Sequence, residues 1–579
     1  MINQNIKKCA KPQYPSKFTT KKGIISDPQE KAENFNDFFV NVGPNISNSI
    51  KTDSNSYKQF LESPNAHSIF LQPATETEIY SIVKKLKPKK SKDCFNMSTD
   101  VLKRSVKALS GPITKLVNKC FQDGVFPDCL KTSIVVPLFK KGDPSVYSNY
   151  RPIALLPQVS KVVEKCMEIR LRKFCEKHFI LSQKQFGFRD NYNTGMAVSA
   201  FLENVYEKLN ANEFTAGIYL DLRKAFDVID HDILLKKLEH YGVRGVTLDL
   251  FSSYLRNRTQ HVKLLNNVSS PKLIRSGVPQ GSVMGPLFFL LYINDLVNCC
   301  KVANFYLFAD DTSILYSHTD INVLITNVNR SLINVKHWLD ANKVAVNAQK
   351  SVSMLFKSFS PLFKPCIDNE PLEVVESTTV LGIEIDKDLN FKRHISKLQA
   401  SLSSCIGILN KLKHKFTEKT LILMYNSLFL SKLSYCCTTF GLKYKTCVYE
   451  FERLQLKSLS LSLKLSYSNV RIYMKKHNML LFSDIVKSQA CMYMHKAFNA
   501  TLPAPLQRHF QQRNMHRFSK FKNNFTVRHC HSSFNHSILS VYGVKIWNAL
   551  PDRIRTVNSS SRFISLLKPY LISQSKDYC

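Results

Sequence analysis

Two adjacent aspartates, Asp310 and Asp311, stand between two short apolar segments at 305–308 and 312–316. This pattern predicts a β-hairpin with both carboxylates at its tip, where Asn-Gly or Asp-Gly would be the more comfortable turn. Neighbouring carboxylates repel each other, and a protein keeps them where a bound cation offsets the repulsion. A lone Asp-Asp pair is nevertheless more often a solvated surface turn, so a metal site needs support from another acid.

A third acid, Asp221, ends the short apolar strand predicted at 217–221 and precedes an amphipathic helix predicted at 232–241. An acid at a strand end, close in space to an Asp-Asp hairpin, provides the ligands of a two-metal site with Mg²⁺ ions about 3.5–4 Å apart. Such ions activate an attacking hydroxyl and stabilise charge on a transferring phosphoryl group. Mg²⁺ prefers oxygen ligands. The three acids therefore favour nucleotidyl transfer with two Mg²⁺ ions, for which Mn²⁺ is an alternative.

The net charge narrows the range of partners. The chain has 579 residues, with 81 Lys and Arg against 44 Asp and Glu, which leaves a charge of +37. Such a field attracts polyanions, and nucleic acid is the commonest of these, since each neutralised phosphate releases a counterion. An anionic membrane surface is the alternative. No apolar run reaches the ~20 residues of a transmembrane helix, and the N-terminus lacks an apolar signal core. We therefore expect an intracellular protein, in nucleus and cytoplasm, without a membrane partner.

Two further patterns carry less weight. The sixteen cysteines include no C-x-x-C, and the ligands in His529-Cys530-His531 are too close together to surround one zinc ion easily, which favours free thiols in a reducing compartment. The basic run at 84–92 has three interpretations that remain open: a nuclear import signal, a phosphate-contacting strip or a solvated loop.

Apolar periodicity divides the chain into five regions that must position the acids, and their mixture of helices and strands predicts an α/β (α+β) fold. The regions are a basic linker or remnant at 1–75, helices with short strands at 76–215, alternating strands and helices at 216–395, helices with Lys-rich faces at 396–470, and a mainly helical basic region at 471–579. Individual predictions include helices at 76–86, 102–126, 395–416 and 418–437, and a strand at 133–139.

The motifs in order resemble the reverse transcriptases of non-LTR retrotransposons, especially the jockey-like group. Phe308-Ala309-Asp310-Asp311 matches the family's hallmark box, Asp221 its first metal-binding acid, and Ser276–Phe289 its Pro-Gln-Gly block, followed by Leu-Tyr-Ile-Asn-Asp-Leu at 291–296. Other similar blocks are Asn149–Ile153, Gln185–Arg189, Asn347–Ser351, Leu381–Asp386 and Ile546–Pro551. The resemblance implies a right-hand polymerase with fingers at 76–215, an antiparallel palm sheet packed on helices at 216–395, and a helical thumb at 396–470.

The same resemblance implies an RNA-directed DNA polymerase that extends a DNA primer on an RNA template with dNTPs. It assigns Asp221, Asp310 and Asp311 to metal binding and catalysis, and Lys350 to protonation of pyrophosphate. Phe226 takes the place of a gate against the ribose 2′-hydroxyl. The implied substrate-binding residues are Leu222, Gln280 and Gly281, together with Arg151 and one of Lys140 or Lys141 on a predicted hairpin that would grip the triphosphate.

Three positions depart from the family's pattern. Asn96 ends a changed version of the usual Gly-x-Asp-Gly turn, Asn193 precedes Thr194 where Ser-Thr is usual, and Phe391 replaces a common Trp. The chain also offers only about 75 residues before the fingers, so we expect no endonuclease of the kind that precedes the polymerase in full-length relatives. The alternative function is that of an inactive relic that binds nucleic acid through its charge alone.

Overall fold

The computed structural model describes residues 14–20, 23–50, 56–441, 443–512, 523–528 and 538–575. His529, Cys530 and His531, considered above for zinc, lie outside these residues. The chain divides into two compact units, each made of three segments. Unit 1 contains residues 1–182, 221–301 and 333–347, and unit 2 contains residues 183–220, 302–332 and 348–579.

Unit 1 is built on a five-stranded sheet. Its order is β4-β3-β6-β7, with β8 also paired to β6. The strands are β3 (Thr132–Phe139), β4 (Tyr150–Leu155), β6 (Arg258–Leu264), β7 (Asn267–Val268) and β8 (Lys272–Ile274). β3 alternates buried and half-buried residues along most of its length, as expected of a strand with one covered face. It pairs antiparallel with β4 and parallel with β6, and the strand predicted at 133–139 is confirmed.

The N-terminal region, expected to be a basic linker or remnant, contains a packed helix. α2 (Pro28–Asn48) packs against β6, β7 and β8. Its Phe35 ring lies edge-on to Phe18 and Tyr147, with centroids 5.2 and 4.5 Å away, and all three rings are buried. Only one face of this helix is apolar, and the unit 1 sheet covers that face.

The remaining helices of unit 1 pack mainly on one another. They include α3 (Glu76–Lys85), α4 (Thr99–Arg104), α5 (Val106–Asp123), α6 (Gln158–Lys177), α8 (His231–His240), α9 (Val246–Leu255) and α10 (Gly285–Tyr292). α3 and α8 confirm the helices predicted at 76–86 and 232–241. The single helix predicted at 102–126 is two helices, because Ser105 ends α4 and begins α5.

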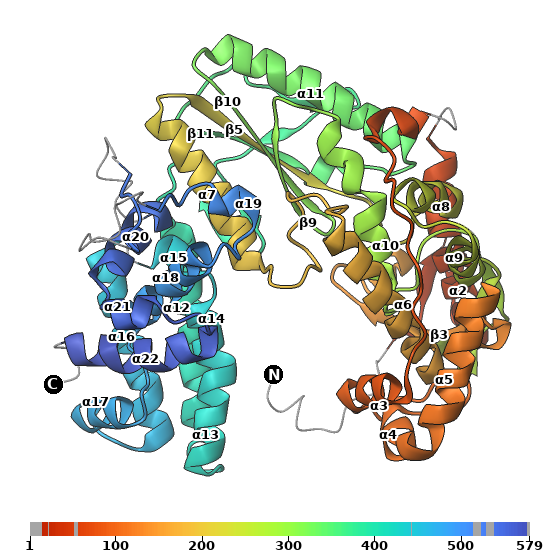
Figure 1. Cartoon of the computed structure of the whole chain (residues 1–579), viewed down its shortest axis with the longest axis horizontal. Helices are drawn as coiled ribbons and strands as arrows, with labels where there is room; N and C mark the ends of the chain where they lie inside the picture. Colours follow the sequence, from red (N-terminus) through yellow and green to blue (C-terminus); the bar gives the residue numbers. More distant parts are fainter. Residues whose placement is uncertain are drawn as a thin grey trace. The chain divides into compact units, whose positions relative to one another are not determined.

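The principal sheet of unit 2 has the order β14-β11-β5-β10-β9 (Figure 1). Its strands are β5 (Phe214–Asp221), β9 (Asn304–Phe308), β10 (Asp311–His318), β11 (Val352–Phe356) and β14 (Glu373–Val374). β5 is the central strand, and its six interior residues are buried. The helix α7 (Thr194–Asn210) packs on β9 and β10. The boundary between the two units falls within β5, between Leu220 and Asp221.

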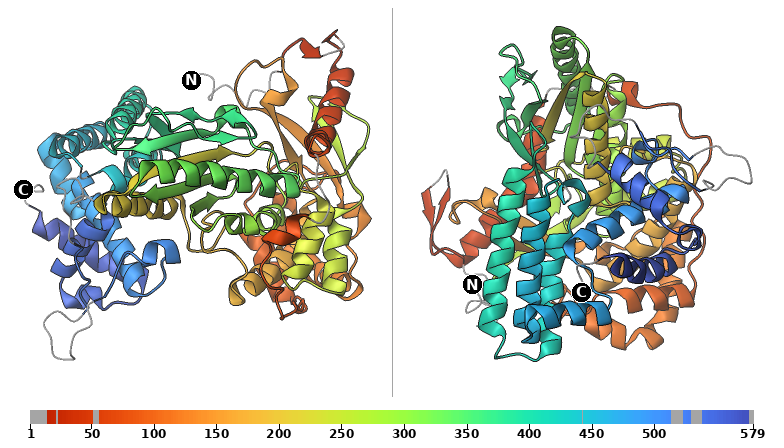
Figure 2. Two further views of the ribbon diagram at one scale, coloured as in Figure 1. Left: turned by 90° about the horizontal axis from the view of Figure 1, so that it is seen from above. Right: turned by 90° about the vertical axis from the view of Figure 1, so that its left-hand side faces the viewer.

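The rest of unit 2 is a small hairpin followed by helices. The hairpin is β15 (Ser377–Val380) with β16 (Ile383–Asp386), joined through Leu381 and Gly382. The helices, coloured teal to dark blue in Figure 2, include α12 (Lys392–Leu412), α13 (Glu418–Met424), α16 (Lys445–Leu463), α17 (Tyr467–Lys476), α18 (Phe482–Phe498), α20 (Leu539–Ala549) and α22 (Ser560–Gln574). The C-terminal region is thus helical, and the fold is mixed α/β, as predicted.

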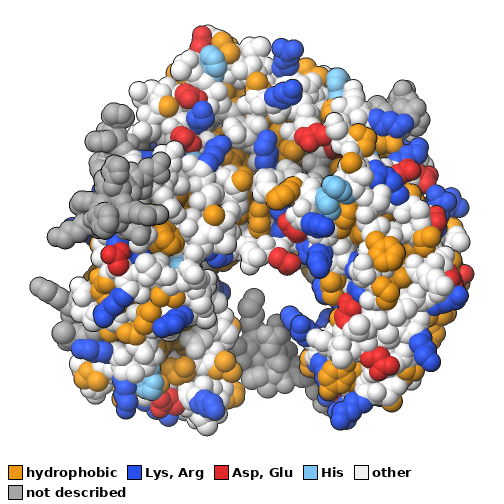
Figure 3. Space-filling model, in the orientation of Figure 1, with side chains coloured by type: hydrophobic (Ala, Val, Ile, Leu, Met, Phe, Trp, Pro, Cys, Tyr) orange, Lys and Arg blue, Asp and Glu red, His pale blue; other side chains and the backbone are white. Residues whose placement is uncertain are grey.

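On the face drawn in Figure 3, positive charge does not gather in one patch. Lys and Arg side chains are spread over the whole face shown in Figure 3, with acidic side chains between them. Within the described residues, no helix combines the length and apolar character that crossing a bilayer requires.

Candidate active site

The predicted Asp-Asp hairpin is confirmed. β9 and β10 pair antiparallel, with Phe308 opposite Asp311, so Ala309 and Asp310 form a two-residue loop. Ala309 lies in the left-handed region at φ 55°, where Gly is the usual residue because a Cβ costs about 1–2 kcal/mol. Asp310 and Asp311 are both exposed. The chain thus holds a strained backbone in order to present two neighbouring carboxylates to solvent.

Gln185 holds this turn, a role that sequence reasoning did not identify. Its Oε1 accepts hydrogen bonds from the backbone N–H groups of Gly187 (2.7 Å) and Ala309 (3.1 Å). The Phe186 N–H donates to the Leu307 carbonyl at 2.7 Å, which pairs this segment with β9. A Cβ on Gly187 would lie only 2.4 Å from the Ala309 nitrogen. The block at 185–189 is recognisable in the sequence, but nothing there shows that it supports the turn before Asp310.

Asp221 occupies the strand beside this hairpin. It is the last residue of β5, and β5 is the sheet neighbour of β10, which begins with Asp311. The Asp221 carbonyl accepts the Asn347 N–H at 2.8 Å, and Leu222 forms a bridge with Val346. Strand order therefore assigns the third predicted acid to the strand adjoining the first two.

The donor set suits a hard cation. All three candidates are carboxylates, and Asp310 makes no hydrogen bond or ion pair with the described residues. Among those same residues, no group of three or more His, Cys, Asp or Glu side chains is arranged to hold a metal ion. Mg²⁺ is usually held by one or two carboxylates together with substrate phosphates and water. The assignment of Asp221, Asp310 and Asp311 as ligands remains a prediction.

The Pro-Gln-Gly block in unit 1 is a tight loop before α10. The Gln280 carbonyl accepts the Ala154 N–H at 2.9 Å, which ties the loop to β4. Gly281 has φ 126°, and a Cβ there would lie 2.8 Å from the Ala154 carbonyl oxygen. Gly277, at φ 79°, approaches the Asp227 carbonyl in the same way, with 2.7 Å to a Cβ. Glycines in such a loop can let the backbone approach a base pair closely. Here the close contacts of both glycines are with the protein's own backbone.

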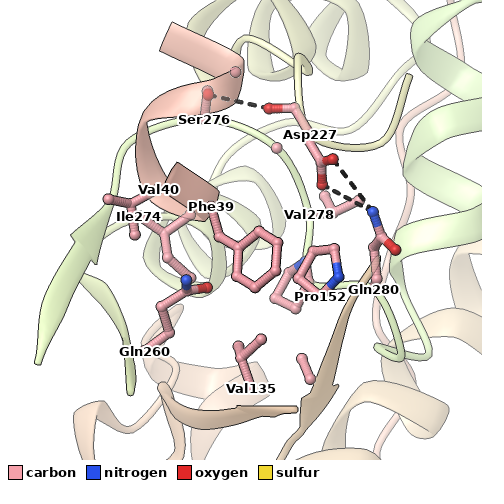
Figure 4. A pocket seen from close by; sticks show the side chains of 14 residues that line it. Phe39, Val40, Val135, Pro152, Asp227, Gln260, Ile274, Ser276, Val278 and Gln280 are labelled. Carbon is pink, nitrogen blue, oxygen red and sulfur yellow. Dashed lines mark hydrogen bonds between the residues drawn. The ribbon is translucent and has the colours of Figure 1, made fainter. Parts of the chain in front are cut away.

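A half-buried acid, Asp227, faces this loop. The Gln280 Nε2 donates to both carboxylate oxygens of Asp227, at 3.0 and 3.3 Å (Figure 4). Burial raises the pKa of the Asp227 carboxyl, while the Gln280 amide and the charge of Lys224 act in the opposite direction. The preceding residue, Phe226, is half-buried and stacks on Phe289 of α10 with centroids 4.7 Å apart. The predicted sugar gate therefore has a ring held against a buried aromatic neighbour.

The predicted cationic hairpin is the connection between β3 and β4. The Lys140 N–H donates to the Asn149 carbonyl at 2.9 Å, which closes the loop, and Gly142 adopts φ 91° within it. Arg151 lies on β4 opposite Leu138, and its side chain is exposed, as is that of Lys140. The hairpin is confirmed, and the contact of these cations with a triphosphate remains a prediction.

Lys350 ends a short 3-10 turn (Ala348–Lys350) and is exposed. On one side of this turn, Ala345 accepts the Arg223 N–H at 2.8 Å; on the other, β11 pairs with β5. The turn is thus anchored on both sides to β5 and to the residues that follow it. The role of Lys350 as a proton donor stays a prediction. The block at 381–386 lies in the β15–β16 hairpin.

The three departures from the family's pattern preserve local structure. Asn96 adopts φ 60°, a left-handed conformation that Asn tolerates better than most residues. Asn193 is the N-cap of α7 and accepts the Met196 N–H at 2.9 Å. Phe391 is fully buried and precedes α12, and the Lys443 ammonium lies 5.8 Å from its ring centroid. Each substitution therefore retains a capping, turning or packing function.

Comparisons with known proteins agree with this geometry. Residues 139–385 match the family model for reverse transcriptase (RNA-dependent DNA polymerase). The matched range includes the three acids, the Pro-Gln-Gly loop and the β15–β16 hairpin up to Ile385.

Within that class, the chain is similar to the polymerases of non-LTR transposons, as the motifs predicted. It is 29% identical over 377 residues to a probable RNA-directed DNA polymerase from transposon BS, and 26% identical over 419 residues to the RNA-directed DNA polymerase from mobile element jockey, both of Drosophila melanogaster. These alignments cover 62% and 69% of this chain but only 40% and 45% of the relatives. The chain thus spans less than half the length of the proteins it matches.

Proposed function

We propose that this chain extends the 3′ end of a DNA primer on an RNA template, using dNTPs and two Mg²⁺ ions. One observation carries the proposal: the exposed acids of the β9–β10 turn and the acid that ends β5 belong to adjoining strands of one sheet, inside the region that matches the reverse transcriptase family. The net charge of +37 supports nucleic acid as the partner.

The protein's own groups divide the remaining work. Asp221, Asp310 and Asp311 would hold the ions, which when bound lower the pKa of the primer hydroxyl and offset charge on the transferred phosphate. Lys140 or Lys141 and Arg151 bind the triphosphate through charge-assisted hydrogen bonds. Phe226 excludes a ribose 2′-hydroxyl by steric contact, Gln280 contacts the nascent base pair, and Lys350 donates a proton to the departing pyrophosphate. Arg151 and Lys140 carry the exposed cationic groups that this binding requires.

The test is primer extension by the purified chain on matched RNA and DNA templates. Asp310→Ala should lower the rate on the order of a thousandfold or more, because several kcal/mol of phosphoryl stabilisation is lost and each 1.36 kcal/mol is about tenfold. Asp100→Ala is a matched control, since Asp100 is an exposed acid in a helical i,i+4 pair with Arg104. Exposed pairs of this kind contribute little, so the control should retain the wild-type rate.

Two outcomes would contradict the proposal in different ways. Mg²⁺-dependent synthesis that survives Asp310→Ala would show that the metal site has been misassigned. A wild-type chain that binds primer and template yet does not extend would favour the alternative of an inactive relic. Both results are separable from misfolding by comparing the circular dichroism spectra of wild type and variant.

A further inference from the structure

We propose that Asp227 is a positioning residue: it fixes the carboxamide of Gln280 in one orientation, so that Gln280 offers its carbonyl oxygen to a sugar hydroxyl of the bound substrate. This inference rests on the proposed function. It specifies that Gln280 acts as a hydrogen-bond acceptor in its contact with substrate. A Gln amide can present either a donor or an acceptor, and the two ends are distinguished by their hydrogen-bond partners.

The orientation of Gln280 follows from its partner. Asp227 Oδ1 and Oδ2 are acceptors when ionised, so only the Nε2 end of Gln280 can face them, at 3.0 and 3.3 Å. Reversing the amide would place Oε1 against a carboxylate and convert an attraction into a repulsion. Within the described residues, Oε1 accepts no hydrogen bond, and Figure 4 shows it directed away from Asp227. The acceptor is therefore available for an outside donor.

Asp227 is itself held rigidly. Its N–H donates to the Lys224 carbonyl at 2.8 Å, and its carbonyl accepts the Ser276 hydroxyl at 3.2 Å. Gly43 of α2 packs so closely that a Cβ there would lie 2.0 Å from the same carbonyl oxygen. Because the backbone is immobilised on both sides, the carboxylate is a fixed reference against which the Gln280 amide is aligned.

The space beside the pair excludes a separate ligand site. The adjoining cavity has a volume of about 40 Å³, lined also by Phe39, Val135 and Gln260 (Figure 4). That is room for about one or two water molecules and far too little for a nucleotide. This cavity therefore has no room for a nucleotide beside Asp227, whose carboxylate instead binds the Gln280 amide.

An exposed carbonyl oxygen accepts from an O–H or an N–H donor, and we assign this donor to a sugar hydroxyl. Two sources carry such a group: the 2′-hydroxyl of an RNA template and the 3′-hydroxyl of an incoming nucleotide. A DNA template lacks the first, and a dideoxynucleotide lacks the second. Comparing the variants on these substrates assigns the source, because the effect of losing the acceptor disappears only when its own donor is absent.

The experiment compares Asp227→Asn, Gln280→Glu and the double variant in the full chain. An asparagine amide can face Gln280 with either end, so Asp227→Asn should lower kcat/KM for dNTP about tenfold, the loss of one hydrogen bond of ~1.4 kcal/mol. Gln280→Glu places two carboxylates together and should be worse.

The double variant provides the decisive comparison. Its introduced asparagine amide donates to its introduced glutamate, whose second oxygen restores the acceptor at the loop. The kcat/KM for dNTP should therefore return to within about threefold of wild type. Additive losses in the double variant would overturn the proposal.

A second measurement separates this proposal from the proposed function. Affinity for dNTP is measured by fluorescence on a labelled primer–template with Ca²⁺ replacing Mg²⁺, so that no catalysis is needed. Weaker binding by Asp227→Asn and recovery in the double variant would support positioning even if the wild type failed to extend. Extension by the wild type with unchanged binding and kinetics in Asp227→Asn would overturn positioning alone.

Discussion

Two glutamines in two regions of this molecule are used in opposite senses. Gln185, in unit 2, turns its carbonyl oxygen inward to two backbone N–H groups at the turn before Asp310. Gln280, in unit 1, turns its amide nitrogen toward the carboxylate of Asp227. Gln185 is buried, whereas Gln280 is half-buried. The same type of side chain thus stabilises a turn by accepting hydrogen bonds in one loop, and is oriented by donating them to a carboxylate in the other.

The acids differ in the same way. Asp310 is exposed and stands on a backbone that other groups immobilise, which suits a ligand that must reach a metal ion. Asp227 is largely shielded and acts on a neighbouring side chain. In Asp310 only the backbone is held in place, which leaves the carboxylate available to a ligand. In Asp227 the carboxylate is held as well, which suits a residue that orients a neighbour. Substitutions on either side of this contrast should therefore have different effects.

Among substitutions that probe this contrast between the two glutamines, the largest effect is expected at Gln185. Gln185→Leu leaves the buried N–H groups of Gly187 and Ala309 without an acceptor, at a cost of about 1–3 kcal/mol each. Displacement of the turn by about 1 Å should lower the extension rate on the order of a hundredfold. Gln185→Glu keeps an acceptor oxygen and should retain more activity in the same primer-extension assay. Equal impairment of the two variants would contradict the role of the carbonyl.

A smaller effect is expected at Gly187. Gly187→Ala brings a Cβ within 2.4 Å of the Ala309 nitrogen, and backbone on both sides has little freedom to yield. Overpacking of this kind costs about 1–3 kcal/mol, which should appear as a lower melting temperature and a slower extension rate. Gly407→Ala in α12 is the control, because no atom lies within 4 Å of the added Cβ. The control should be neutral or slightly stabilised.

On the Gln280 side, the prediction concerns pH. In Gln280→Glu, two carboxylates meet where burial already raises the pKa of Asp227, so one proton is shared at low pH. The shared proton is lost as pH rises through the raised pKa, and the two like charges, opposed only in part by Lys224, then repel. Extension by the variant relative to wild type should therefore fall as the pH rises through the raised pKa of the pair. A flat ratio would show that the two side chains do not face each other.

The smallest effect is expected at Ala309. Ala309→Gly removes a Cβ from a residue at φ 55°, which relieves about 1–2 kcal/mol of strain, but it also increases the entropy of the unfolded chain by ~0.4–1 kcal/mol. The melting temperature should be unchanged or slightly raised. A clear decrease in thermal scans would mean that the methyl group contributes packing that outweighs the strain.

Much of the candidate site was predictable because its signals are local. The apolar segments around Asp310 and Asp311 predict a hairpin, and β9 and β10 form one. Asp221 at the end of an apolar run predicts a strand terminus, which β5 confirms. The packing of α2 was not predictable in this way, because the strands that cover its apolar face lie more than 200 residues further along the chain.

The amino-acid sequence by itself determined which chemistry is available: three carboxylates, a cationic hairpin, glycine-rich turns and a large positive charge. Only the tertiary structure decided which partner each group meets. Gln185 and Gln280 have identical chemistry in the sequence, yet one faces backbone N–H groups and the other faces a carboxylate. The physical reason is that a hydrogen bond depends on the direction and identity of a partner distant in the chain, which local residue type and spacing do not encode.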